Sequence, residues 1–134
     1  MVMCPVLGEL PWGMRDFKRL EIWRRAHALA MALHDLAADY GRLGHGHLRS
    51  QLLRAADSIA TNIAEGCGSE SNREFARFLD MSIKSASETE NHLISVRDLK
   101  LMSQDNWSRY STETIEIRRM TFGYRKRVLE DEER

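Results

Sequence analysis

A chain of 134 residues is long enough for one domain with a buried core and too short for two. Lysine plus arginine and aspartate plus glutamate number 20 each, so no overall field attracts nucleic acid or anionic lipid. The cysteines, Cys4 and Cys67, lack metal-site spacing and are too few for a disulfide framework, which favours a reduced cytosol. No apolar run reaches the ~18 residues of a membrane span, and no secretory signal is present, so a cytoplasmic location is expected.

The first 14 residues show no periodic pattern. Two prolines and two glycines predict an irregular arm over residues 1–14. Two interpretations stay open. One is that translation naturally starts at Met14, which an intact-mass measurement would test. The other is that Val6, Leu7 and Trp12 of the arm pack on the bundle or on a neighbouring subunit.

A first helix is predicted over residues 16–40, with Asp16 as its N-cap. Its apolar face has heptad-like spacing and comprises Leu20, Trp23, His27, Ala30, Leu33 or His34, and Ala37. His27 and His34 could form a metal pair, but without a third ligand a half-buried packing role is favoured. Residues 41–47 are expected to form the connecting loop, with His45 and His47 as plain loop residues. No metal site is expected.

A helix over residues 48–68 is predicted to be the centre of the domain. About half of its circumference is apolar on a helical wheel. That half comprises Leu48, Leu52, Leu53, Ala55, Ala56, Ile59, Ala60, Ile63 and Ala64, with only Arg49 interrupting it. A single seam needs only about 100° of apolar surface, so two packing neighbours are expected, and the alanines would let them approach closely. Gly66 and Gly68 are predicted to end the helix with positive φ.

A polar row borders this apolar half. Ser58, Asn62 and Glu65 follow an i, i+4, i+7 spacing. The row either coordinates a ligand or forms a helix–helix or subunit seam held by side-chain hydrogen bonds. The absence of a nucleophile–base pair favours the seam. An enzyme with Glu65 as base beside a histidine is therefore disfavoured, and no catalytic residue, cofactor or small-molecule substrate is expected.

A third helix is predicted over residues 72–102, because Ser71 and Glu74 form an S-x-x-E capping box. Its inner face comprises Phe75, Phe78, Leu79, Ser82, Ala86, Thr89, Leu93 and Val96. Ser82 and Thr89, at the centre of this face, indicate a close helix approach or partners for the polar row, because buried hydroxyls need acceptors. The edge of the same face carries Ser85, Glu88 and His92.

A fourth helix is predicted from Ser103 or Asp105 to at least Phe122. Its apolar side comprises Trp107, Tyr110, Ile117, Met120, Tyr124 and Val128. Arg118, Arg119, Arg125 and Lys126 share one arc, into which Phe122 projects; we call these five residues the basic stripe. Such a stripe suits single-stranded RNA or a phosphate backbone.

Two other interpretations of the stripe stay open. It could be a solvated face that balances the acidic residues 130–133 of a neighbouring subunit, or Gly123 could break the helix and the stripe with it. Residues 131–134 are expected to form an acidic, frayed tail, which leaves residues 15–130 as the bundle.

Four helices with short joins indicate an all-α, antiparallel up-down-up-down four-helix bundle. Three groups of residues carry a family likeness. The first helix contributes Phe17, Leu20, Ile22 and Trp23. The second contributes Arg54, Ala55, Ser58, Asn62, Ile63, Ala64, Glu65 and Gly66, and the third Phe75, Phe78, Leu79, Ser85, Glu88, Asp98 and Leu99. Together they resemble the four-helix-bundle proteins encoded in 23S ribosomal RNA intervening sequences, and a related branch, the accessory variability determinants of diversity-generating retroelements.

The resemblance implies a ring-shaped homo-oligomer, with a pentamer as the family precedent. In the retroelement branch the ring associates with a reverse transcriptase and template RNA; the ribosomal branch has no assigned activity. Ser69 stands where the family often has a basic residue, which weakens any inherited phosphate contact there, and Lys84 stands where glycine is usual. The expectation is a non-enzymatic accessory protein associated with RNA or reverse transcriptase; the alternative is a self-assembling scaffold with a protein partner and no nucleic-acid binding.

Overall fold

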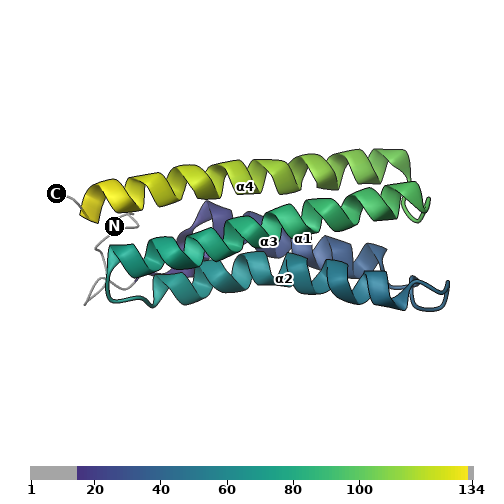
Figure 1. Cartoon of the computed structure of the whole chain (residues 1–134), viewed down its shortest axis with the longest axis horizontal. Coiled ribbons are helices and arrows are strands. Elements are labelled where there is room, and N and C mark those ends of the chain that lie inside the picture. Colours follow the sequence, from purple (N-terminus) through teal and green to yellow (C-terminus); the bar gives the residue numbers. More distant parts are fainter. Residues whose placement is uncertain (1–14, 133–134) are drawn as a thin grey trace.

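The computed structural model describes residues 15–132, and within this range the chain is all-helical, with no β-strand (Figure 1). Its helices are α1 (Glu21–Leu36), α2 (Gly46–Cys67), α3 (Asn72–Asp98) and α4 (Gln104–Glu132), preceded by a 3-10 turn at Phe17–Arg19. The predicted all-α class with four helices is confirmed. The predicted arm, residues 1–14, lies outside the described residues. The predicted tail was placed too early, because α4 continues to Glu132.

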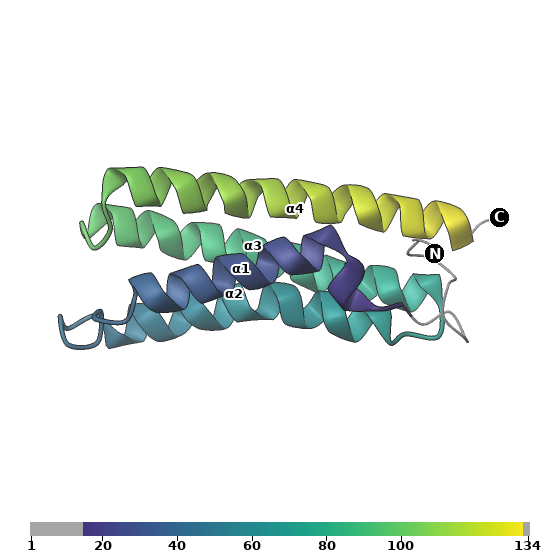
Figure 2. The same ribbon diagram turned by 180° about the vertical axis from the view of Figure 1, so that it is seen from behind.

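The helices lie alongside one another as a bundle, and consecutive helices join at alternating ends (Figure 1). Figure 2 shows the same arrangement from behind. Helix α1 packs on α2 and α4, and α3 also packs on α2 and α4, whereas α1–α3 and α2–α4 make no backbone contacts in the described range. These two pairs are therefore the diagonals, and the α1–α2 face is opposite the α3–α4 face. The α1–α4 seam is the least extensive of the four.

The first helix is shorter than predicted at both ends. Asp16 caps the 3-10 turn rather than α1, because its carboxylate accepts a hydrogen bond from Lys18 N at 3.1 Å. Leu20 then adopts an extended conformation, and α1 starts after it. After Leu36 the chain continues as turns, so the prediction of helix to residue 40 was wrong. Tyr40 nevertheless stays buried.

The core face of α1 matches the predicted one in part, because Leu20, Ala30, Leu33 and Ala37 are buried as predicted. The buried residues are Ile22, Ala26, Leu29, Ala30 and Leu33. His27 is exposed and Trp23 is half-buried. Heptad spacing misleads here because α1 packs against two neighbours, and its buried arc is broader than a coiled-coil seam.

The apolar half of α2 is buried as predicted, from Leu52 to Ile63. The helix starts at Gly46, so His47 is its second residue rather than part of the loop. Positive φ at the two glycines was a wrong prediction, because Gly68 has φ −87° and Gly66 is still helical. Gly66 is instead needed for close packing: a Cβ there would lie 2.6 Å from Phe75 Cδ1 and 2.9 Å from Phe78 Cβ.

The start of α3 is as predicted, with Ser71 Oγ accepting from Glu74 N at 3.1 Å. Its end comes at Asp98, earlier than the predicted residue 102, where Lys100 takes a left-handed conformation with φ 59°. Ser103 caps α4 by accepting from Asn106 N at 3.1 Å. Helix α4 runs through Gly123 without a break.

Four buried hydroxyl groups in the described helices donate to carbonyl acceptors. Ser82 Oγ donates to the Ile59 carbonyl of α2 at 2.9 Å, which confirms the predicted close approach of α2 and α3. Thr89, Thr114 and Thr121 are buried and each donates to a carbonyl one turn earlier on its own helix. These bonds remove the cost of burying an unpaired hydroxyl. None of the helices in residues 15–132 is both long and apolar enough to cross a membrane.

Candidate nucleic-acid interface

The basic stripe lies on one unbroken helix, but two of its arginines are used within the fold. Arg118 Nη1 lies 2.7 Å from Glu90 Oε1, and Arg125 Nε lies 2.6 Å from Asp80 Oδ1. Both pairs cross the α3–α4 seam. Their positive charge is therefore balanced by α3 before any ligand approaches.

The rest of the stripe faces solvent. Arg119 pairs with Glu116 one turn earlier on α4. Lys126 has no ion-pair partner among residues 15–132, and beside it Phe122 is 57% exposed. The stripe thus offers one unpaired cation and one exposed ring.

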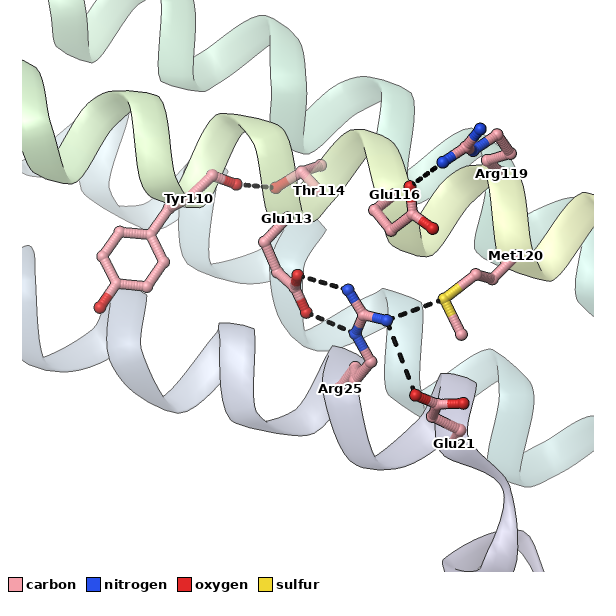
Figure 3. Close-up of polar contacts among 8 residues, drawn as sticks. All are labelled: Glu21, Arg25, Tyr110, Glu113, Thr114, Glu116, Arg119 and Met120. Carbon is pink, nitrogen blue, oxygen red and sulfur yellow. Dashed lines mark hydrogen bonds and ion pairs between the residues drawn. The ribbon is translucent and has the colours of Figure 1, made fainter.

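A second cluster of charge lies at the α1–α4 seam, around Arg25 (Figure 3). Its Nε and Nη2 donate to the two carboxylate oxygens of Glu113 at 2.9 and 2.7 Å. Its Nη1 lies 3.1 Å from Met120 Sδ and 3.7 Å from Glu21 Oε2. The hydrogen bond to Glu113 raises the pKa of the Arg25 guanidinium above its ordinary value. The Arg25–Glu113 pair therefore links α1 to α4.

Two open cavities, of about 420 and about 460 Å³, lie along this seam and share Arg24 in their walls; we call them together the α1–α4 groove. Their walls carry five arginines and two glutamates. The arginines are Arg19, Arg24, Arg25, Arg109 and Arg127. The groove therefore holds an excess of three positive charges on a chain whose formal net charge is zero.

Two arginines of α4 flank the groove and lie over tyrosine rings. The Arg109 guanidinium carbon lies 5.2 Å from the Tyr110 ring centre, and that of Arg127 lies 5.4 Å from the Tyr124 ring centre. Neither has an acidic partner in the described part of the chain. Stacking on a ring limits the rotamers of each side chain while leaving its N–H groups available.

Arg24 lies between these two along the groove, because it lines both cavities. Its Nη1 donates to the Lys18 carbonyl at 3.1 Å, and no acid of residues 15–132 pairs with it. Arg109 and Arg127 are 18 residues apart, which is five helical turns, or about 27 Å along one side of α4. That span suits an extended polyanion better than a single small anion.

Sequence reasoning missed this groove. Arg109 and Arg127 share one side of the predicted fourth helix, and that spacing was available as a signal. The packing of α1 against α4 could not be predicted in this way. No local sequence pattern indicates which arginines pair with acids of a neighbouring helix.

The polar row joins α2 to α3. Asn62 Nδ2 donates to Ser58 Oγ at 2.8 Å and to the Ser58 carbonyl at 2.9 Å. Ser85 Oγ of α3 also donates to Ser58 Oγ, at 2.8 Å. Glu65 is exposed and makes no hydrogen bond to these groups in the described structure. The row therefore has the geometry of a helix seam.

The other residues of the family pattern are dispersed. Arg54 and Glu88 are exposed, and Glu88 lies 3.5 Å from His92 on the same helix. Gly66 is buried against the Phe75 ring and the Cβ of Phe78. These residues do not converge on one cavity.

The predicted histidine pair is divided between two contacts. The His27 ring stacks on Trp23, with centroids 4.9 Å apart. His34 Nε2 lies 2.9 Å from Asp57 Oδ1 of α2. No group of three or more metal-binding side chains occurs within residues 15–132.

One end of the bundle is closed by Arg15. Its backbone N–H donates to the Cys67 carbonyl at 3.1 Å, its guanidinium lies 4.6 Å from the Phe75 ring centre, and it donates to Asn72 Oδ1. Burial lowers the pKa of Arg15 and raises that of the Cys67 thiol to about 12. Cys67 is consequently an unreactive core thiol.

The fold and the hydrogen-bonded α2–α3 seam define a helical-bundle protein, in which ion pairs also join α1 to α4 and α3 to α4. The family model described as 23S rRNA-intervening sequence protein matches residues 18–123, and the chain belongs to this family.

A solved structure supports the same fold. It is that of a protein of unknown function from the S23 ribosomal protein family of Bacteroides thetaiotaomicron. The TM-score is 0.74 at 21% sequence identity, over 78% of this chain and 98% of that one. No curated protein sequence matches the chain.

Proposed function

We propose that this protein is a non-enzymatic accessory protein that binds single-stranded RNA along the α1–α4 groove and assembles into a ring-shaped homo-oligomer of antiparallel bundles. The observation that carries the RNA proposal is the row of Arg109, Arg24 and Arg127, which lack acidic partners in the described chain. A family named for an rRNA intervening sequence is consistent with an RNA ligand.

The chemistry of the groove fits a phosphate backbone. Arginine side chains bind phosphate oxygens through paired N–H donors and stack on bases through their flat faces. The arginines on Tyr110 and Tyr124 are held in place before binding, so less rotamer freedom is lost. A reverse transcriptase, as in the retroelement branch, would then meet the protein on the same RNA.

The competing function is a protein-interaction scaffold without nucleic-acid affinity. The zero net charge of the chain favours it, since RNA-binding proteins usually carry a basic excess. Under this alternative the groove arginines are solvated and contribute no affinity.

Binding of a fluorescent single-stranded RNA, followed by anisotropy, tests the proposal. The variant Arg109→Glu/Arg127→Glu should weaken binding by at least tenfold, because it replaces two phosphate contacts with two repulsions. The control Arg54→Glu/Arg73→Glu makes the same change of charge at exposed positions of α2 and α3 and should bind as the wild type does.

A third variant tests the basic stripe. Arg119→Glu/Lys126→Glu should leave RNA binding within about twofold of wild type if the groove is the site. Loss of binding in this variant alone would move the site to the stripe. No RNA binding by the wild type would favour the scaffold.

A further inference from the structure

One of the two cavities in the α1–α4 groove, of about 420 Å³, has an aromatic wall, and we call it the Tyr110 cavity. Tyr110 projects from α4 toward α1 on one side of the Arg25–Glu113 bridge, and Met120 lies on the other side (Figure 3). Arg25 and Glu113 also line the cavity, so the bridge closes one end of it. A half-buried ring and an ion pair therefore bound the cavity along α4.

The α1 side of the Tyr110 cavity is apolar and consists of small side chains. Ala28 and Ala32 are four residues apart, so they lie on the same side of α1, and buried Leu29 lines the cavity with them. Ala28 is exposed and Ala32 is half-buried, so α4 does not cover them fully. The two alanines leave room for a flat apolar group from outside, which a larger side chain at either position would occupy.

The rim of the Tyr110 cavity is cationic. Arg24 and Arg109 line it, and neither pairs with an acid in the described part of the chain. The hydroxyl group of Tyr110 has no hydrogen-bond partner within residues 15–132. An apolar hollow with arginines and a free hydroxyl at its edge suits a flat ring that is joined to phosphates, which is the chemistry of a nucleotide.

From these observations we infer that the Tyr110 cavity receives a base of the bound RNA, stacked against the Tyr110–Arg109 pair, while Arg24 and Arg109 bind the neighbouring phosphates. The inference rests on the RNA binding of the proposed function and names the contact that the bases make. Every base has a π face, so stacking of this kind accepts any base. Bases that are paired inside a double helix cannot enter the cavity.

Two fluorescent oligomers with the same phosphates separate base contacts from backbone contacts. One is an oligouridylate of about eight nucleotides, and the other is an abasic ribose-phosphate oligomer of the same length. Anisotropy should show that the wild type binds the oligouridylate about tenfold more tightly, because stacking adds to the phosphate contacts. Binding of both oligomers should weaken as salt rises, because both keep the phosphates.

A substitution on α1 tests the cavity without removing a charge. Ala28→Leu places a larger side chain in the cavity from an exposed position of α1. It should reduce the preference for oligouridylate to within about twofold and leave binding of the abasic oligomer within about twofold of wild type. Ala38→Leu makes the same change at an exposed position outside the cavity and should keep the full preference.

Substitutions of Tyr110 test the stacking itself. Tyr110→Leu should lose the preference for oligouridylate, because it removes the aromatic face while keeping an apolar side chain. Tyr110→Phe should keep most of the preference, because the ring remains. Circular dichroism of each variant verifies that the helices remain intact.

The outcomes separate this inference from the proposed function. Equal affinity of the wild type for the two oligomers would overturn the base site and leave the proposed binding of the RNA backbone standing. An unchanged preference in Ala28→Leu would also overturn it, because the bases would then stack elsewhere. Failure of the wild type to bind either oligomer would overturn the base site and the proposed RNA binding together.

Discussion

At the scale of single residues, Gly66 shows how a family motif is explained by packing. A Cβ at this position would meet Phe75 and Phe78 at less than 3.0 Å, and both belong to α3. The glycine is therefore required by the close approach of α2 and α3, whereas the sequence suggested a left-handed helix end. The motif marks a contact between helices.

Gly66→Ala should lower the free energy of unfolding by about 1–3 kcal/mol, because the added methyl group forces the phenylalanines apart. Gly123→Ala provides the matched control, because its Cβ would meet nothing within 4 Å in the middle of α4. That variant should gain about 0.5–1 kcal/mol from helix propensity. Urea unfolding measures both, and equal effects in the two variants would refute the packing explanation.

The raised pKa of the Cys67 thiol predicts that the free energy of unfolding falls at alkaline pH. Its pKa is about 12 in the folded protein, against 9.0 ordinarily, because it is buried. Above pH 9 the unfolded chain releases this proton while the folded chain keeps it, so the free energy of unfolding falls by about 1.4 kcal/mol per pH unit until about pH 12.

Urea unfolding of wild type and Cys67→Ala between pH 8 and pH 11 checks this linkage. The substitution should flatten the fall above pH 9 by up to about 1.4 kcal/mol per pH unit. The raised pKa of Tyr40, also due to burial, contributes a fall of the same sign in both proteins. Parallel curves for the two proteins would show that Cys67 does not titrate as its burial requires.

At the scale of the helices, the α1–α4 seam depends on a polar bridge more than the other seams do. It is the least extensive contact of the bundle, and Arg25 spans it to Glu113 with two hydrogen bonds. Both side chains are about one-third exposed, so water screens part of their attraction.

Arg25→Met should lower the free energy of unfolding by about 1–2 kcal/mol, because it leaves Glu113 without its partner across the seam. Arg119→Met is the control, since Arg119 is largely exposed and pairs only within α4. It should cost less than about 0.5 kcal/mol. A result in which both variants lose the same amount would mean that the bridge does not hold α1 on α4.

The number of helices, the Ser71 cap and the buried half of α2 could be predicted because each depends on local pattern. The start of α1 could not be predicted, because the extended conformation of Leu20 follows from the 3-10 turn before it. The acidic partners of Arg118 and Arg125 could not be predicted either, because ion pairs across a seam depend on how the helices are placed. The candidate RNA site consequently moved from a stripe visible on one helix to a groove between two.

At the scale of the whole molecule, a chain of zero net charge distributes its charge unevenly between its faces. Two arginines at the α3–α4 seam are balanced by acids of α3, while the α1–α4 groove keeps three excess positive charges. The proposed RNA site lies on the face that carries this excess.

The salt dependence of RNA binding tests the central claim most directly. Each contact to a single-stranded phosphate contributes about 0.7 to the slope of log association constant against log salt concentration. Replacing Arg109 and Arg127 together by Met should therefore reduce that slope by about 1.4, while Arg54→Met/Arg73→Met should leave it unchanged. Equal slopes in wild type and the groove variant would contradict RNA binding along the α1–α4 groove.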